Sequence, residues 1–148
     1  MKTRLYFVSN SSSSSFVCEI CNHSEVGYDG PQSVGMVCCE NDHTFCEEHL
    51  MEGAEYDYEV PEKFCPICNF IEPSYPDLMS YFFKTTNISK DTVFEEIKKI
   101  NRRRKVLRDH EYVEFCLRNL NTTIDELLNK LRNEFSSYTE FRKSIRRY

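Results

Sequence analysis

The sequence lacks several features that common protein classes need. It has no tryptophan and only four glycines among its 148 residues. A glycine-rich phosphate loop, a carboxylate pair and a catalytic triad are all missing, so the chain offers no candidate residues for catalysis of its own. No apolar run is long enough to cross a bilayer, which predicts that there is no membrane partner. The apolar stretch at residues 5–8 is too short for the core of a signal peptide. We therefore expect a cytoplasmic protein.

Cysteine and histidine, by contrast, are concentrated in one segment. Seven of the eight cysteines and three of the four histidines lie between Cys18 and Cys68. A Cys-x2-Cys pair stands at each end of this segment, and such a pair places two thiolates where both can reach one tetrahedral ion. In a reducing compartment clustered cysteines act as metal ligands rather than as disulfides. The sequence therefore predicts two Zn²⁺ ions and eight ligands: Cys18, Cys21, Cys39, His43, Cys46, His49, Cys65 and Cys68.

One ligand position is ambiguous. Cys38 and Cys39 are adjacent, so one of the two thiols is spare. Cys39 leaves the more usual gap of three residues before His43, and we prefer it as the third ligand, although the sequence leaves the choice open.

The ligand series and two local strings resemble the RING finger family. The string His43-Thr-Phe-Cys46 is similar to the central His-x-Phe-Cys of that family, and Cys65-Pro-Ile-Cys68 is similar to its closing Cys-Pro-x-Cys. The chain departs from the commonest pattern at His49, where most members have cysteine. The resemblance implies a cross-braced arrangement. One ion would be held by Cys18, Cys21, Cys46 and His49, and the other by Cys39, His43, Cys65 and Cys68.

RING fingers most often act as ubiquitin ligases that bind a conjugating enzyme in a shallow apolar groove. The resemblance places Ile20 and Pro66 in that groove, with Leu50 and Met51 on the surface beside it. Two features depart from active ligases: the large aromatic residue of the central helix is missing, and Asn69 stands where a basic residue often follows the last cysteine. We therefore expect an interaction factor with a protein partner of unknown identity, and keep a RING-type ubiquitin ligase as the alternative.

The N-terminus shows a second resemblance. Residues 7–16, with five consecutive serines, look like a short leader carried by many uncharacterised phage-encoded proteins. The resemblance implies that the chain is phage-encoded and works in the host cytoplasm. A virion structural protein is a further alternative for its function. Residues 3–8 are rich in residues that favour strands and predict a short strand, and residues 11–15 predict a flexible loop.

The second half of the chain has a different pattern. Apolar residues recur at helical spacing from residue 78 onward, Ser89 is placed to cap one helix, and Thr123 with Glu126 forms a capping box. We also expect a short helix at residues 47–53 that carries His49. The fold class is therefore α+β, a small zinc-stapled RING-like module followed by an all-helical C-terminal bundle. The expected domains are residues 1–15, 16–72 and 73–148.

Charge is divided unevenly between the two halves. Residues 1–75 contain three Lys or Arg against 13 Asp or Glu, whereas residues 76–148 contain 16 against 11. An acidic first half argues that this half does not grip phosphates. The strongest candidate for binding nucleic acid is a basic run in the second half. A solvent-exposed helix end, or a patch that docks onto the acidic half of the chain, would have the same composition. The basic residues are Lys98, Lys99, Arg102, Arg103, Arg104 and Lys105.

Overall fold

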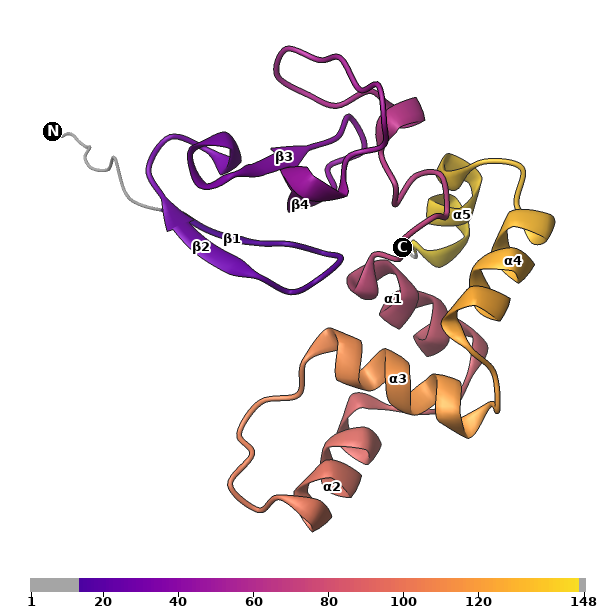
Figure 1. The fold of residues 1–148 in the computed structure, drawn as a ribbon. Helices are drawn as coiled ribbons and strands as arrows, with labels where there is room; N and C mark the ends of the chain where they lie inside the picture. The colour runs from indigo at the N-terminus through magenta and orange to yellow at the C-terminus, as the bar shows by residue number, and fades with distance from the viewer. Residues whose placement is uncertain (1–13, 147–148) are drawn as a thin grey trace, which may run out of the picture. The chain divides into compact units, whose positions relative to one another are not determined.

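The computed structural model describes residues 14–146, which contain five α-helices and two antiparallel two-stranded sheets (Figure 1). This confirms the α+β class. Contacts divide the chain into two compact units, Met1–Ile67 and Cys68–Tyr148. The domain boundary expected after residue 72 stays a prediction. The strand expected at residues 3–8 and most of the resemblance at residues 7–16 lie outside the described residues. No helix within residues 14–146 combines the length and apolarity that a membrane crossing needs.

Two hairpins form the first unit. Strand β1 (Ser14–Val17) pairs with β2 (Ser24–Gly27), and β3 (Met36–Cys38) pairs with β4 (Thr44–Cys46). Ser14 and Ser15, expected in a flexible loop, belong to β1, because they face Gly27 and Val26 across the first hairpin. Pairing with a neighbouring strand here overrides the composition of the serine tract.

The two hairpins close with similar turns. In the first, the amide of Cys18 donates to the carbonyl of His23 (2.8 Å), and in the second Cys39 donates to His43 (2.9 Å). Each turn contains one residue in the left-handed region, Asn22 with φ 65° and Asp42 with φ 67°. Asparagine and aspartate tolerate this region better than other residues with a side chain. Both turns therefore carry candidate ligands on short, defined backbones.

Short 3₁₀ turns complete the first unit: η1 (Pro31–Val34), η2 (Glu47–His49) and η3 (Glu62–Phe64). The helix expected at residues 47–53 is wrong, since η2 ends at His49. The chain then extends, and the amide of Met51 donates to the carbonyl of Phe64 (3.3 Å) instead of continuing a helix. Tertiary pairing thus competes successfully with local propensity.

The second unit consists of the helices α1 (Tyr75–Thr85), α2 (Lys90–Ile100), α3 (Asp109–Asn119), α4 (Ile124–Glu134) and α5 (Tyr138–Ile145). The predicted caps are confirmed: Ser89 accepts from the amide of Thr92, and Thr123 and Glu126 form the reciprocal capping box. Helix α1 contacts α3 and α5, and α2 contacts α3.

An aromatic cluster fills the core of this unit. Phe141 on α5 is 1% exposed, and its ring centre lies 5.3–6.0 Å from those of Tyr138, Phe135, Phe70 and Tyr81. Aromatic pairs at such distances stabilise a core beyond the area that they bury.

Two apolar residues at the ends of helices lie outside the core. Ile100 is 90% exposed and Leu120 is 50% exposed. Ile100 is the last residue of α2 and Leu120 is the C-cap of α3, where the helical spacing no longer sets the direction of a side chain.

Candidate metal centres

Eight candidate ligands gather into two groups within the described residues. In each group the ligand atoms all lie within 4.8 Å of one another. The first cluster consists of Cys18, Cys21, Cys46 and His49, and the second cluster consists of Cys39, His43, Cys65 and Cys68.

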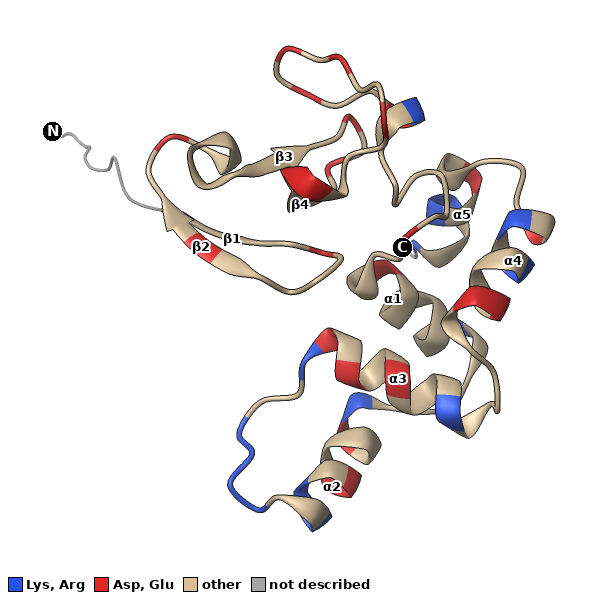
Figure 2. Cartoon of the chain, viewed as in Figure 1, with Lys and Arg blue, Asp and Glu red and all other residues tan. Residues whose placement is uncertain are grey.

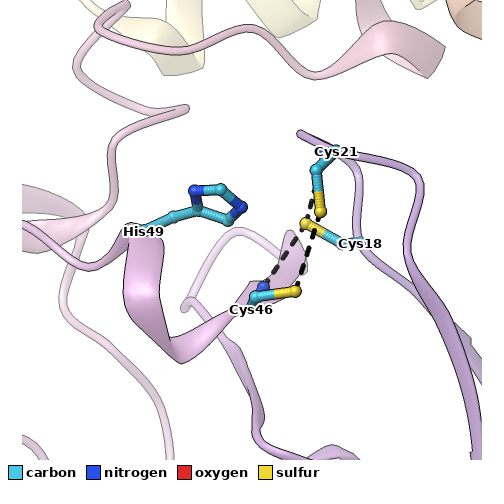
Figure 3. A group of neighbouring side chains, drawn as sticks. All are labelled: Cys18, Cys21, Cys46 and His49. Atoms are coloured by element: carbon cyan, nitrogen blue, oxygen red, sulfur yellow. Dashed lines mark hydrogen bonds between the residues drawn. The ribbon is translucent and has the colours of Figure 1, made fainter.

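The first cluster combines the first hairpin turn with the end of the second hairpin. Figure 3 shows the three sulfur atoms close together, with the imidazole of His49 beside them. Two hydrogen bonds of 2.9 Å tie the turn to β4: the amide of Glu19 donates to the carbonyl of Thr44, and the amide of Thr44 donates to the Glu19 carboxylate. They hold the Cys-x2-Cys turn next to the strand that ends in Cys46.

The second cluster lies on the other hairpin turn and on the segment after η3. A parallel bridge joins Cys39 to Val60, whose amide donates to the carbonyl of Cys38 (2.9 Å). All four ligands of the second cluster are buried, whereas in the first cluster only Cys18 is buried and Cys21 is exposed.

The distances between donor atoms fit one ion of zinc's size in each cluster. With Zn–S bonds of about 2.3 Å and tetrahedral angles, two sulfurs lie about 3.8 Å apart, and a sulfur and an imidazole nitrogen about 3.6 Å apart. The sulfurs of Cys21 and Cys46 are 3.8 Å apart. Cys39 Sγ lies 3.4 Å from His43 Nδ1. The residues present could therefore hold two metal ions.

Backbone amides surround the most buried sulfur of each turn. Cys18 Sγ accepts from the amides of Ile20, Cys21 and Cys46, each at 3.4 Å. Cys39 Sγ accepts from the amides of Asn41 (3.3 Å) and His43 (3.4 Å). Hydrogen bonds to sulfur favour the thiolate over the thiol and fix the direction of the ligand. The turns are thus shaped to hold anionic sulfur.

The thiols of the first cluster differ in pKa. Partial desolvation by neighbouring groups disfavours the Cys21 thiolate, but hydrogen bonds from His49 and from the backbone of His23 lower the pKa of Cys21 to about 7. Burial raises the pKa of Cys46 to about 12, and the negative charge of Cys18 adds to this effect. Adjacent thiols therefore resist ionising together, and a divalent cation would neutralise their combined charge.

The remaining cysteines and histidines lie outside both clusters. Cys38 is half-buried and its thiol faces the carbonyl of Cys39 (3.6 Å), while burial raises the pKa of this thiol. It is Cys39 that joins the second cluster. His23 pairs with Glu25 at 2.7 Å on the surface. Cys116 is fully buried on α3, as expected of a core cysteine.

The expected partner surface differs from the structure in its exposure. Ile20 is only 8% exposed and Pro66 is buried, and each lies between the two cysteines of a Cys-x2-Cys turn. Leu50 and Met51 are half-buried. A role of these four residues in binding a partner stays a prediction.

The basic run is divided between a helix and a loop. Lys98 and Lys99 belong to the last turn of α2, and the four other residues lie in the irregular segment that joins α2 to α3 (Figure 2). Sequence reasoning missed Glu111, which forms an ion pair with Arg104. The only sequence signal for this ion pair was the position of Glu111, three residues after the N-cap residue Arg108.

Comparisons of this chain with protein-family models, with curated proteins and with solved structures each found no match. The case for metal binding therefore rests on the geometry of the two clusters.

Proposed function

We propose that the chain is a zinc-binding protein–protein interaction factor, in which two structural zinc ions hold a RING-like module in shape. The observation that carries this proposal is the alternation of the clusters along the chain. The first and third ligand pairs belong to the first cluster, and the second and fourth pairs belong to the second cluster. Interleaving of this kind makes each ion a cross-link between segments distant in sequence.

The donor set supports zinc rather than a harder ion. Three sulfurs and one imidazole are the ligands that zinc prefers, whereas calcium and magnesium take oxygen. Four protein ligands complete a tetrahedron and leave no position for a reactive water. With three thiolates the net charge of each site would be about −1, which is typical of structural centres.

The composition of the first unit supports a structural role for the ions. Among its described residues, 14–67, few apolar side chains other than the ligands are fully buried: Met36, Val37, Phe45, Val60 and Ile67 are each at most 1% exposed. Binding of structural zinc contributes about 10–16 kcal/mol per site in small domains. A whole domain is stable by only about 5–15 kcal/mol. Loss of both ions should therefore unfold this unit.

Zinc content and protease protection test the proposal together. Purified protein should contain two zinc ions per chain. Removing them with a chelator should expose Phe45, which is buried, to cleavage by chymotrypsin, while Tyr58, which is 82% exposed, is cleaved in both states and serves as the internal reference. Protection of Phe45 that persists after complete removal of the metal would contradict a structural role.

Two adjacent cysteines provide a matched pair of variants. Cys39→Ser should lower the zinc content and remove the protection of Phe45. Cys38→Ser should retain two ions, since Cys38 lies outside both clusters. Equal loss of zinc from the two variants would show that the third ligand is wrongly assigned.

The interaction surface that we propose is the acidic loop at residues 52–59. It carries four acidic residues and the exposed ring of Tyr58, and the side chain of Gln32 donates to the carbonyl of Tyr58 (3.3 Å). An exposed tyrosine surrounded by negative charges suits a protein partner with a basic surface. Changing the four acids to amides should weaken capture of that partner and leave the zinc content unchanged; unaltered capture would exclude the loop.

A RING-type ubiquitin ligase is the second candidate, favoured by the same alternation of ligand pairs. It predicts autoubiquitination with a conjugating enzyme, and inactivity across a panel of such enzymes would remove it. Leu50→Ala is a better probe than Ile20→Ala, because Ile20 is buried in a ligand turn. Phage origin and a virion role depend on residues 7–16, and co-purification with particles would test them.

A further inference from the structure

We propose that the basic segment, residues 98–108, is a binding site for the phosphate backbone of a nucleic acid. The segment runs from the last turn of α2 to the N-cap of α3. It contains seven Lys or Arg and no acidic residue. Figure 2 shows this run of positive charge along the connection between the two helices. The inference is independent of the metal centres.

Internal contacts give the segment a defined conformation. Arg104 forms an ion pair with Glu111 on the first turn of α3 and also donates to the carbonyl of Val106 (3.2 Å). Glu111 accepts as well from the amide of Arg108 (3.1 Å), and Asn101 accepts from the amide of Arg103 (3.1 Å). One arginine and one glutamate therefore act as a brace that positions the other cations.

Four cations of the segment stay available for a ligand. Within residues 14–146, the side chains of Arg102, Arg103, Lys105 and Arg108 form no ion pair, and all four residues are exposed. Lys99 pairs with Glu96 (3.3 Å), and Lys98 lies 5.0 Å from the centre of the Phe94 ring. Four unneutralised charges on a braced loop create a strong local positive potential.

Three of these four cations line an open cavity. Its volume is about 540 Å³, and it is lined by Arg103, Arg104, Lys105, Val106, Arg108, His110 and Glu111. The single carboxylate in this lining is the one paired with Arg104. The space suits an anionic group whose oxygens accept from several donors at once, and guanidinium forks bind phosphate oxygens in pairs.

Nucleic acid fits this surface better than a membrane. Peripheral membrane helices bury a broad face of large apolar or aromatic residues. The basic segment has only two isolated aliphatic residues with high exposure, Ile100 at 90% and Val106 at 67%. Its arginines outnumber its lysines by four to three, which favours recognition of phosphate geometry over general attraction to an anionic surface.

The number of available cations sets the expected salt dependence. Each neutralised phosphate changes the slope of log K against log salt by about −0.9 for duplex DNA and −0.7 for single strands. Four contacts give a slope of roughly −3.6 or −2.8, so affinity should fall roughly 50- to 150-fold between 50 and 200 mM salt.

Fluorescence anisotropy with the full chain tests the inference. The probes are a labelled 20-nucleotide single strand and a 20-base-pair duplex of mixed sequence. The variant Arg102→Gln, Arg103→Gln, Lys105→Gln should reduce the slope to about −1 and weaken binding at low salt. The matched control, Lys90→Gln, Arg118→Gln, Lys130→Gln, removes the same charge from exposed sites elsewhere in the second unit and should keep the full slope.

Each other outcome overturns the inference. Absence of binding at 50 mM salt would exclude the site, and equal weakening of both variants would reduce the effect to net charge. If phosphatidylserine vesicles or polyglutamate bind as tightly as the oligonucleotides and compete with them, the ligand is a membrane or an acidic protein instead. Circular dichroism of both variants should match the parent, because none of the six residues is buried.

Discussion

The difference in exposure between the two clusters predicts that zinc ions bound there would leave at different rates. A chelator removes a metal by replacing its ligands one at a time, so the process begins at a ligand that the chelator can reach. Cys21 in the first cluster is exposed, whereas all four ligands of the second cluster are buried. Release from the second cluster therefore requires that the surrounding core first opens.

The proposal of one ion per cluster sets the expected amplitudes of this process. With one ion in each cluster, half of the zinc should leave in a fast phase and half in a slow phase. If opening of the core costs about 3 kcal/mol, the slow phase is roughly 150-fold slower, since 1.4 kcal/mol corresponds to a factor of ten. The assay is absorbance of a zinc-binding dye after mixing with excess chelator, with chymotryptic cleavage at Phe45 followed in parallel.

A ligand variant identifies the fast ion. Cys21→Ser should accelerate or remove the fast phase and leave the slow phase at one ion per chain. A single phase that releases both ions, or a variant whose slow phase alone is altered, would refute the reasoning from exposure.

Three further predictions concern the second unit, and urea unfolding followed at 222 nm measures each of them. Phe141→Ala should destabilise this unit by about 3–5 kcal/mol, because removal of its buried ring leaves a cavity. The control Phe83→Ala, at a ring that is 43% exposed, should cost about 1 kcal/mol or less. Equal costs of the two substitutions would contradict the aromatic core. Thr123→Ala removes one half of the capping box and should cost about 1 kcal/mol, and an unchanged midpoint would exclude this role. Arg104 holds the pKa of Glu111 below the ordinary value of 4.5, so Glu111 stabilises the folded state above that pH and loses this contribution as pH falls through its lowered pKa. Glu111→Gln should therefore be less stable than the parent at pH 6, and the difference should shrink as pH falls below 4.5 through the lowered pKa of Glu111; a constant difference would exclude the ion pair as its cause.

Helices were predictable where local signals agreed. Helix α4 begins at the capping box of Thr123, and its apolar residues Leu127, Leu128 and Leu131 are buried. Spacing and capping act within a few residues along the chain, so a single sequence contains them. Residues 47–53 show the opposite case, because the contact between Met51 and Phe64 that ends the turn joins segments thirteen residues apart.

The sequence predicted which residues belong to the candidate site better than it predicted which of them share an ion. The Cys-x2-Cys spacing indicates that two neighbouring thiols share an ion, but it does not determine which distant pair joins them. Only the resemblance to RING fingers implied that pairing. The choice of Cys39 over Cys38 depends on where β3 ends, since successive side chains of a strand point to opposite faces.

Contacts between loop residues and distant parts of the chain were the least predictable feature of the fold. Glu111 braces a segment that begins thirteen residues earlier. Phe70 contacts Tyr138 and Phe141 from a position with φ 54° and no periodic pattern around it. Contacts of this kind depend on the path of the folded chain.

The two hairpin turns have a consequence for the chemical ageing of the protein. Asn22 and Asp42 occupy the same left-handed position in the two turns. Deamidation of Asn22 to aspartate would give the first turn the residue that its counterpart already contains. Such a product should differ from fresh protein by one negative charge and about one mass unit, and its zinc content should be the same.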